Sequence, residues 1–324
     1  PIPNSQFPIP NSQFPIPNSQ FPIPNSQFPH PLFPIPYSLF PMTSNPIPTP
    51  SDLQLLVLDI DGTLVGESNT ITPRVKIAVQ EVLDQGVQVA IATGRMYRSA
   101  LRFHQELHLT LPLIAYQGGW IQDPQEADPL FHQPLPLAQA LDILDCLSDP
   151  AFDTGLCVHL YLNDRLFVQE RGEQSGDYAQ RSGVPLENVT DWRSILSTEP
   201  TKLLVLSTET TLLEQIWQRF TDRYSPEDLY LTRSAEHFVE AAHPAVNKGA
   251  AVKYLVEERL GLQPHQVMAI GDNYNDLEML SYAGWGIAMG TAPAPVQAVA
   301  QAVAPSVAED GVAIVLEQWL KGLK

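Results

Sequence analysis

The sequence is short of cysteine, of basic residues and of long apolar runs. Its two cysteines, Cys146 and Cys157, do not form a CxxC pair and are too few for a disulfide framework, so we predict a reducing, cytoplasmic location. Lys and Arg number 18 against 36 Asp and Glu, which gives a formal net charge of −18. This disfavours a nucleic-acid surface or an anionic-membrane anchor, because both need clustered positive charge. No stretch approaches the ~18 consecutive apolar residues of a membrane span, and a signal peptide is not apparent, so we expect a soluble protein.

Charged residues are absent from the first 50 positions, which hold 16 of the 31 prolines. Residues 1–28 are four copies of PIPNSQF, followed by a decayed run. The two prolines in each repeat exclude a heptad coiled coil, because proline removes helical hydrogen bonds and clashes with the preceding turn. The tract is therefore either a polyproline-II or disordered segment, or a translation of tandem CCCAATT repeats upstream of the gene. On the second hypothesis Met42, the first methionine, lies near the true start.

Two aspartates follow a short apolar run where the charged part of the chain begins. Residues 55–58 read LLVL and predict a buried strand, and Asp59, Asp61 and Gly62 come directly after it in the string DIDGT. Open α/β sheets bind ligands at the carboxyl ends of their strands, so the two carboxylates lie where a ligand is expected. Asp-Gly is also common turn chemistry, which leaves a plain acidic turn as the alternative for this segment alone.

A helix and a second strand follow. Thr72 and Pro73 predict the start of the helix, and residues 87–92 predict the strand. The β-α-β order requires a right-handed crossover, which brings Thr93, in the string TGR, to the same sheet edge as Asp59. The Thr93 hydroxyl is then a candidate to hydrogen-bond a phosphate oxygen, with an ordinary turn as the alternative.

Polar residues gather again in the last third of the chain. Lys248 opens an alanine-rich helix that we predict to reach about residue 260, and a compact positive charge at a helix N-terminus suits a phosphate. A third strand, residues 267–270, runs into the string GDNYND, which brings Asp272 and Asp276 to its carboxyl end. Taken singly, Lys248 also fits a solvated first turn, and the acidic string also fits a helix N-cap.

Together these strings resemble the four motifs of the haloacid dehalogenase superfamily: DxDGT, then Thr-Gly-Arg, then Lys, then GDxxND, in this order. The longer string GDNYNDLEML resembles the Cof-type branch. The resemblance implies an α/β fold, in which a Rossmann-like, doubly wound parallel sheet forms the core and an α/β cap of class IIB is inserted. It assigns residues 51–119 and 244–324 to the core and residues 120–243 to the cap, and it leaves residues 1–50 as the Pro-rich tract.

The resemblance also assigns chemistry to the motif residues. Asp59 is implied as the nucleophile that forms an aspartyl-phosphate, and Asp61 as the general acid and base, with a like charge nearby favouring a proton on Asp61. Hard oxygen ligands at a phosphate site fit Mg²⁺. The implied metal ligands are the carboxylates of Asp59 and Asp272, that of Asp276 directly or through water, and the backbone carbonyl of Asp61. The implied phosphate-binding groups are Thr93, Lys248, Asn275 and backbone N–H groups near Gly62.

The inserted segment alternates between helical and strand patterns, as expected of a separate α/β domain. Three of its side chains, His159, Tyr161 and Glu240, are candidates for substrate specificity, although strand alternation fits ordinary face residues equally well. Gly118 is a fourth candidate, because Gln117-Gly118-Gly119 stands where Cof-type sequences usually have Asn-Gly-Ala. The predicted elements are a hairpin at 123–129, helices at 137–147, 176–181 and 209–220, and strands at 156–160, 166–169, 202–206, 229–232 and 237–241.

Two histidines, His104 and His108, lie four apart on a predicted helix in the string HQELH. The glutamate stands one place too late for the HExxH zinc motif. We therefore predict that this pair forms a solvated helix face and binds no metal.

The function that the resemblance implies is a Mg²⁺-dependent phosphatase, acting on small phosphorylated metabolites such as sugar phosphates. A phosphosugar mutase of the same superfamily is an alternative, because it returns the phosphoryl group to a sugar instead of water. A non-catalytic phosphometabolite-binding protein is a third hypothesis, although both Asp59 and Asp61 are present. The expected partner is a small phosphorylated metabolite, with no nucleic acid and no membrane, and the oligomeric state stays open.

Overall fold

The computed structural model describes residues 52–322 except 153–154, 171 and 234–236. All of these belong to one compact unit of the chain, residues 41–324. The Pro-rich tract of residues 1–50, with both hypotheses about its origin, lies outside the described residues.

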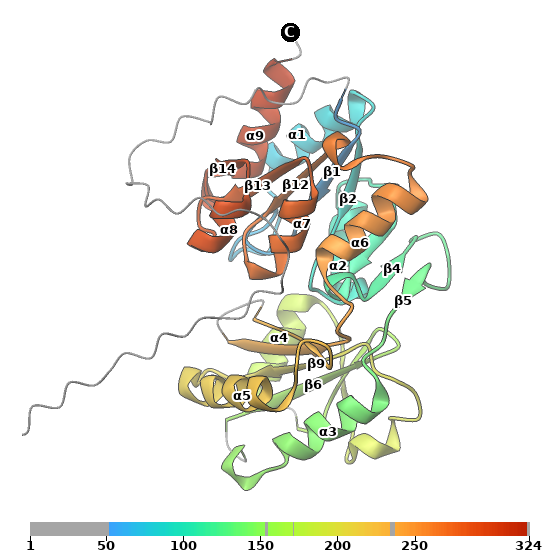
Figure 1. The fold of residues 1–324 in the computed structure, drawn as a ribbon, viewed down its shortest axis with the longest axis vertical. Helices are drawn as coiled ribbons and strands as arrows, with labels where there is room; N and C mark the ends of the chain where they lie inside the picture. Colours follow the sequence, from blue (N-terminus) through green and yellow to red (C-terminus); the bar gives the residue numbers. More distant parts are fainter. Residues whose placement is uncertain (1–51, 153–154, 171, 234–236, 323–324) are drawn as a thin grey trace, which may run out of the picture. The chain divides into compact units, whose positions relative to one another are not determined.

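A five-stranded sheet in the order β14-β13-β12-β1-β2 forms the core, and every neighbouring pair of its strands is parallel (Figure 1). The first strand, β1, lies between β12 and β2, so the sheet grows outward from its centre in both directions. The strands predicted at 55–58, 87–92 and 267–270 are confirmed, whereas β13 and β14 were not predicted. The five strands are β1 (Leu55–Leu58), β2 (Gln88–Ile91), β12 (Val267–Gly271), β13 (Trp285–Met289) and β14 (Ala302–Ala304).

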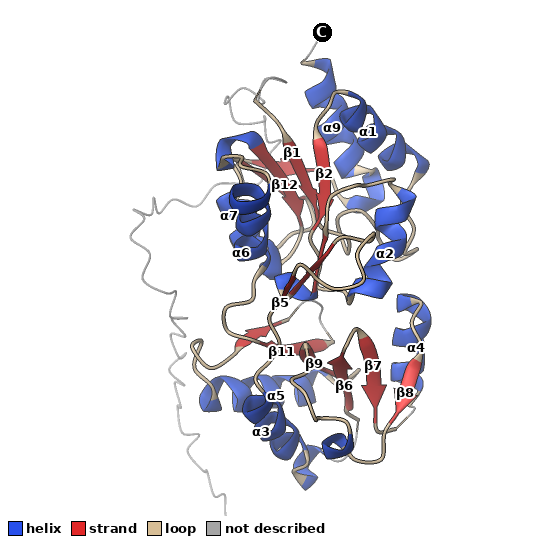
Figure 2. Cartoon of the chain, turned by 90° about the vertical axis from the view of Figure 1, so that its right-hand side faces the viewer, coloured by secondary structure: helices blue, strands red, loops and turns tan. Residues whose placement is uncertain are grey.

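Helices cover both faces of this sheet. Leu56 and Leu58 point into one apolar cluster while Leu55 and Val57 point into another, as the two-residue period of a strand requires. Figure 2 shows α1, α2 and α9 on one side of the sheet and α6 and α7 on the other. This is the doubly wound α/β arrangement that the sequence predicts. The helices are α1 (Pro73–Asp84), α2 (Tyr97–Glu106), α6 (Lys248–Lys253), α7 (Leu277–Tyr282), α8 (Ala294–Val299) and α9 (Gly311–Lys321); a π-helical turn, Tyr254–Arg259, continues α6.

The prediction of a solvated histidine face is wrong for His104. Its side chain is buried in α2, where Nε2 lies 2.8 Å from the carbonyl oxygen of Leu111. His108 is exposed, but it follows the end of the helix in a left-handed conformation, with φ of 53°. The two histidines therefore do not share a helix face, because the helix ends between them.

A small antiparallel sheet joins the core to the inserted segment. It consists of β3 (Leu113–Ala115), β4 (Trp120–Gln122) and β5 (Phe131–His132), and β4 and β5 form the predicted hairpin. A parallel bridge between Ala92 and Ile114 connects this sheet to the end of β2. The predicted boundary between residues 119 and 120 falls between the paired strands β3 and β4.

The inserted segment forms a six-stranded sheet in the order β10-β11-β9-β6-β7-β8, antiparallel except between β7 and β8. Helices α3 and α5 cover one of its faces, into which Leu203 and Val205 point (Figure 1). Leu204 and Leu206 point the other way, into the cluster that includes α1, α2 and α9. The elements are β6 (Cys157–Leu162), β7 (Arg165–Val168), β8 (Leu186–Asn188), β9 (Lys202–Leu206), β10 (Tyr230–Thr232), β11 (Phe238–Ala242), α3 (Leu137–Leu147), α4 (Glu173–Ser182) and α5 (Thr210–Arg223).

None of the helices in the described ranges combines the length and the apolar character that a membrane crossing requires.

Candidate active site

The predicted motif residues meet at one edge of the core sheet. Asp59 follows β1, Thr93 lies just beyond β2, and Asp272 follows β12. These three strands are parallel neighbours, so their carboxyl ends coincide. The backbone N–H of Asp59 donates to the carbonyl of Ile270 at 3.0 Å, which fixes the first carboxylate against the strand that carries the fourth motif.

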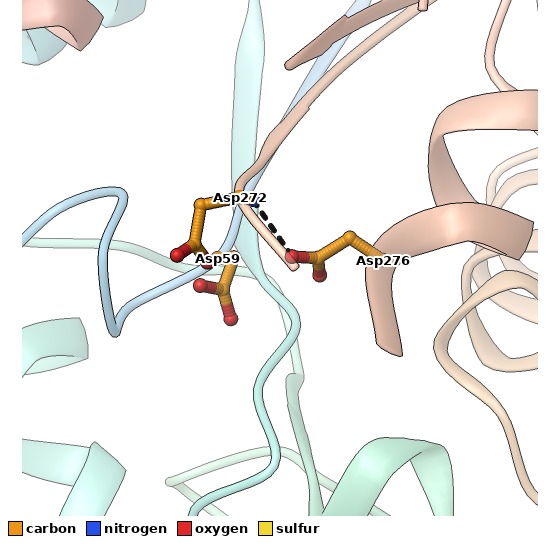
Figure 3. A group of neighbouring side chains, drawn as sticks. All are labelled: Asp59, Asp272 and Asp276. Carbon is orange, nitrogen blue, oxygen red and sulfur yellow. Dashed lines mark hydrogen bonds between the residues drawn. The ribbon is translucent and has the colours of Figure 1, made fainter. Parts of the chain in front are cut away.

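Three carboxylates form an acidic cluster at this edge. Asp59, Asp272 and Asp276 each offer an oxygen, and the three oxygens lie within 4.8 Å of one another (Figure 3). Gly62 makes room for the cluster, because a Cβ at this position would lie 2.0 Å from Oδ2 of Asp272. Its φ of 79° is a second reason for glycine, since other residues rarely adopt that conformation.

Lys248 joins two of these carboxylates. Its Nζ lies 2.5 Å from Oδ1 of Asp59 and 2.6 Å from Oδ1 of Asp276, and its side chain is fully buried at the start of α6. Burial alone would lower the pKa of Lys248, but the charges of Asp276 and Asp59 outweigh it and hold the pKa above its usual value. The ammonium is therefore a fixed positive charge beside the predicted nucleophile.

Asp276 also orders the loop that follows β12. Its Oδ2 accepts the backbone N–H groups of Asp272 at 2.9 Å and Asn273 at 3.1 Å, while its Oδ1 accepts from Lys248. Its side chain is completely buried. One carboxylate thus positions both the lysine and the backbone that carries Asp272.

The charge balance of the cluster fits a divalent cation. Burial raises the pKa of Asp59 to about 7, with Lys248 opposing the shift and Asp276 adding to it. Burial, together with the charge of Asp59, raises the pKa of Asp272 to about 9. A shift of this kind means that the ionised carboxylates lack compensating charge. Hard carboxylate oxygens in this arrangement are the donors that Mg²⁺ prefers.

Asp61 is paired with Arg95. The guanidinium donates through Nη2 to Oδ1 of Asp61 at 2.5 Å and through Nε to Oδ2 at 2.7 Å, and it also reaches Oδ1 of Asn69 at 2.8 Å. The side chain of Asp61 is 50% exposed, and the protein that covers the rest of it would raise its pKa. The hydrogen bonds and charge of Arg95 outweigh this effect, and the pKa of Asp61 lies below its usual value. The expectation that a like charge favours a proton on Asp61 is therefore wrong for this arrangement, because the nearest charge is positive.

The predicted phosphate-binding residues flank the carboxylates. Oγ1 of Thr93 accepts the backbone N–H of Arg95 at 3.1 Å, and Nδ2 of Asn275 donates to Oε1 of Gln117 at 3.0 Å. Gln117 is buried with φ of 58°. Cof-type sequences usually have asparagine at this position. The longer side chain of Gln117 reaches the last motif, GDNYND, and orients Asn275.

A cavity of about 350 Å³ opens beside this cluster, lined by side chains of the inserted segment and by five of the predicted motif residues: Asp59, Asp61, Thr93, Asp272 and Asn275. Gly62, Lys248 and Asp276 are not among its lining residues. Of the four specificity candidates, Glu240 lines it, whereas His159, Tyr161 and Gly118 do not. Sequence reasoning missed Arg95, Lys202 and Arg181, which also line it. The TGR string gave a signal for Arg95, because it places this residue close to Thr93. No motif contains Lys202 or Arg181.

The three candidates outside the cavity have packing roles. His159 is buried, with Nε2 2.9 Å from Oγ of Ser175. Tyr161 is buried and donates its hydroxyl to that of Tyr178 at 2.8 Å. Gly118 has φ of 97°, and a Cβ there would lie 2.7 Å from the carbonyl oxygen of residue 247, so glycine permits the approach of α6.

Known proteins match this chain in sequence and in fold. A family model for haloacid dehalogenase-like hydrolases covers residues 56–316. The chain belongs to this family. The 5-amino-6-(5-phospho-D-ribitylamino)uracil phosphatase YitU of Bacillus subtilis is 28% identical over 267 residues, which span 82% of this chain and 97% of that protein. Pyridoxal phosphate phosphatase YbhA of Escherichia coli is 28% identical over 277 residues, spanning 80% of this chain and 96% of that protein.

A solved structure extends the likeness to the inserted domain. The sugar phosphatase BT4131, of haloacid dehalogenase subclass IIB, superposes with a TM-score of 0.68 at 20% identity and covers 82% of this chain and 98% of its own. The predicted fold class, a doubly wound core with an inserted α/β cap, is confirmed. The family and its named relatives place this chain among the phosphoric monoester hydrolases.

Proposed function

We propose that the protein is a Mg²⁺-dependent phosphatase that hydrolyses small phosphorylated metabolites through an aspartyl-phosphate on Asp59. The observation that carries the proposal is the arrangement of Asp59, Lys248 and Asp272: a buried carboxylate held by a fixed ammonium, with a second carboxylate beside it. A nucleophile, a phosphate-binding cation and a metal ligand at one sheet edge are the parts that phosphoryl transfer needs.

The metal ligands in this proposal are the carboxylates of Asp59 and Asp272, that of Asp276 directly or through water, and the backbone carbonyl of Asp61. Mg²⁺, when bound, supplies positive charge that neutralises phosphoryl oxygens and clamps the substrate. The close approach of Asp272 to Gly62 supports this assignment, because it brings the carboxylate next to the Asp61–Gly62 backbone.

The first chemical step uses Asp59 and Asp61. A carboxylate oxygen of Asp59 attacks phosphorus, and the bond between phosphorus and the ester oxygen breaks. Asp61 is ionised while Arg95 holds it, so the Asp61–Arg95 pair has to open and Asp61 has to take up a proton from solvent before this step. The leaving oxygen takes that proton and departs as an alcohol. Lys248 holds Asp59 in place and supplies positive charge to the phosphoryl oxygens, and Thr93 and Asn275 donate hydrogen bonds to them.

The second step returns Asp59 to its starting state. Asp61, now ionised, takes a proton from a water molecule, whose oxygen attacks phosphorus. The bond between phosphorus and Asp59 breaks, and phosphate leaves. The pairing of Arg95 with Asp61 supports this role, because it stabilises the ionised form that acts as the base.

The substrate of this proposal is a phosphate monoester small enough for the cavity. The named activities of the relatives, on a phosphoribitylamino-uracil and on pyridoxal phosphate, support a small phosphorylated metabolite. Sugar phosphates belong to the same size class. A cytoplasmic location stays a prediction from the cysteine content.

The test is phosphate release from a panel of phosphometabolites that includes sugar phosphates, with Mg²⁺ and with EDTA. Asp59→Asn is the matched control, since it keeps the shape of the nucleophile and removes its charge. Wild type should release phosphate from part of the panel with Mg²⁺ only, and the variant from none. Equal, slow release by both proteins would overturn the proposal, and an isomerised sugar phosphate without released phosphate would favour the mutase.

A further inference from the structure

Lys202 is a buried cap residue that reaches into the core. It begins β9, on the same strand face as Leu204 and Leu206, which is the face that packs against the core cluster. Its side chain and that of Glu240, on the neighbouring strand β11, are each only 4% exposed, and Nζ lies 2.5 Å from Oε2 of Glu240. The ion pair therefore lies on the inner face of the cap, where it lines the cavity.

The ammonium of Lys202 makes its second hydrogen bond to the core. Nζ lies 3.0 Å from the carbonyl oxygen of Gly94. It also lies 5.0 Å from the ring centroid of Tyr161 and 5.8 Å from that of Tyr116, within the range of cation–π contact. Tyr161 belongs to the cap and Tyr116 to the core, so the lysine is enclosed by both.

The Gly94 carbonyl belongs to the peptide group that organises the second motif. The N–H of the same peptide group is that of Arg95, and it donates to Oγ1 of Thr93 at 3.1 Å. Because this oxygen accepts one hydrogen bond from the backbone, the Thr93 hydroxyl proton is left to be donated to a phosphoryl oxygen. The orientation of this peptide group therefore sets the direction of the hydroxyl.

Gln117 of the core packs against the same loop. A Cβ at Gly94 would lie 2.3 Å from Nε2 of Gln117, whose amide also holds Asn275. Gly94 is thus in contact with Gln117 from the core and with Lys202 from the cap. Its next side chain, Arg95, forms the pair with Asp61.

We propose that Lys202, held by Glu240, is a positioning residue of the cap that orients the Gly94–Arg95 peptide group, so that Thr93 donates to the phosphoryl group. This inference rests on the proposed function of the same site. Removal of the lysine frees the carbonyl, and the Thr93 hydroxyl loses its fixed direction.

The test variant is K202M/E240Q. Methionine fills the space of the lysine stem, and glutamine removes the charge of Glu240, whose ion pair K202M would break; replacing both partners of a buried pair is tolerated far better than removing one. With p-nitrophenyl phosphate and Mg²⁺, kcat/KM should fall about 10- to 100-fold, the effect of one charge-assisted hydrogen bond. The Kd for inorganic phosphate should rise by a similar factor.

A double-mutant cycle with Thr93→Val separates positioning from general damage to the cap. In the T93V background, K202M/E240Q should lower kcat/KM and phosphate affinity less than about threefold further, because the hydroxyl through which Lys202 acts is gone. If the two effects multiply in full, Lys202 does not act through Thr93 and the inference is wrong.

S99A is the matched control, since the Ser99 hydroxyl makes a different core–cap hydrogen bond, to the carbonyl of Ser182 at 2.8 Å. It should leave kcat/KM within about twofold of wild type. A loss as large as that of K202M/E240Q would assign the effect to cap attachment in general and would overturn the inference. The Kd for inorganic phosphate can be measured without turnover. If the wild type binds phosphate but hydrolyses no ester, the proposed function is wrong. The double-mutant cycle in phosphate Kd still decides the role of Lys202 in that case.

Discussion

Acidification should destabilise the protein through His159. This side chain is fully buried in the cap, its Nδ1 has no hydrogen-bond partner among the described residues, and burial together with the charge of Lys202 lowers its pKa from 6.5 to about 3. The unfolded chain takes up a proton at His159 as the pH falls through 6.5, and the folded chain does not until about pH 3. The stability that neutral His159 contributes is therefore complete above pH 6.5 and is lost as the pH falls. At about 1.4 kcal/mol per pH unit, acidification from pH 6.5 to about 4 removes about 3 kcal/mol from the free energy of unfolding.

The assay is urea unfolding of wild type and His159→Gln at several values between pH 7 and 4, followed by tryptophan fluorescence. Glutamine can still hydrogen-bond Ser175 but does not titrate. Other groups cancel in the difference between the two proteins, including His104 and His132, whose pKa values burial also lowers. The stability deficit of the variant should shrink by about 3 kcal/mol across this range. A difference that stays constant with pH would refute the reasoning.

Three further predictions concern the acidic edge of the core sheet. Gly62→Ala should lower kcat/KM about 10- to 100-fold at fixed Mg²⁺, because its Cβ would lie 2.0 Å from Asp272; a variant with wild-type kinetics would show that Asp272 need not approach the Gly62 backbone. Arg95→Met should lower kcat about 10- to 100-fold, since Asp61 loses both hydrogen bonds of the guanidinium; an unchanged kcat would remove Arg95 from the mechanism. EDTA should abolish phosphate release and added Mg²⁺ restore it, whereas release that persists after exhaustive chelation would contradict the metal assignment.

The convergence of Asp59, Thr93 and Asp272 was predictable because topology alone enforces it. Each follows a short apolar run, and parallel strands joined by right-handed crossovers end at one edge. Thr72 and Pro73 fixed the start of α1 in the same local way: the Thr72 hydroxyl oxygen accepts the N–H of Val75 at 3.3 Å. Such features depend on a few neighbouring residues and on strand order, and both can be inferred from the chain.

The cap contribution was not predictable because it depends on which face of a strand meets the core. Strand alternation assigns Lys202 and Leu204 to one face of β9, but it does not say that this face closes over the catalytic loop. The same limit explains why Glu240 reaches the cavity while His159 and Tyr161, also on the inner side of the cap sheet, are covered by neighbours. The Arg95–Asp61 pair was missed for a related reason: strand order brings both residues to one sheet edge, but it does not say where the Arg95 side chain points.

The cap holds the segment that follows β2 at a second point, the start of α2. Met96, the N-cap residue of this helix, provides no side-chain hydrogen bond to the helix. Asp164, in the turn between β6 and β7, supplies one instead: its Oδ2 accepts the N–H of Arg98 at 3.0 Å, while its Oδ1 accepts the hydroxyl of Tyr116 at 2.8 Å. A carboxylate at a helix N-terminus is stabilised by the unpaired N–H groups there. Because α2 begins directly after the loop of Thr93 and Arg95, substitutions in the cap can alter the catalytic loop without any contact with substrate.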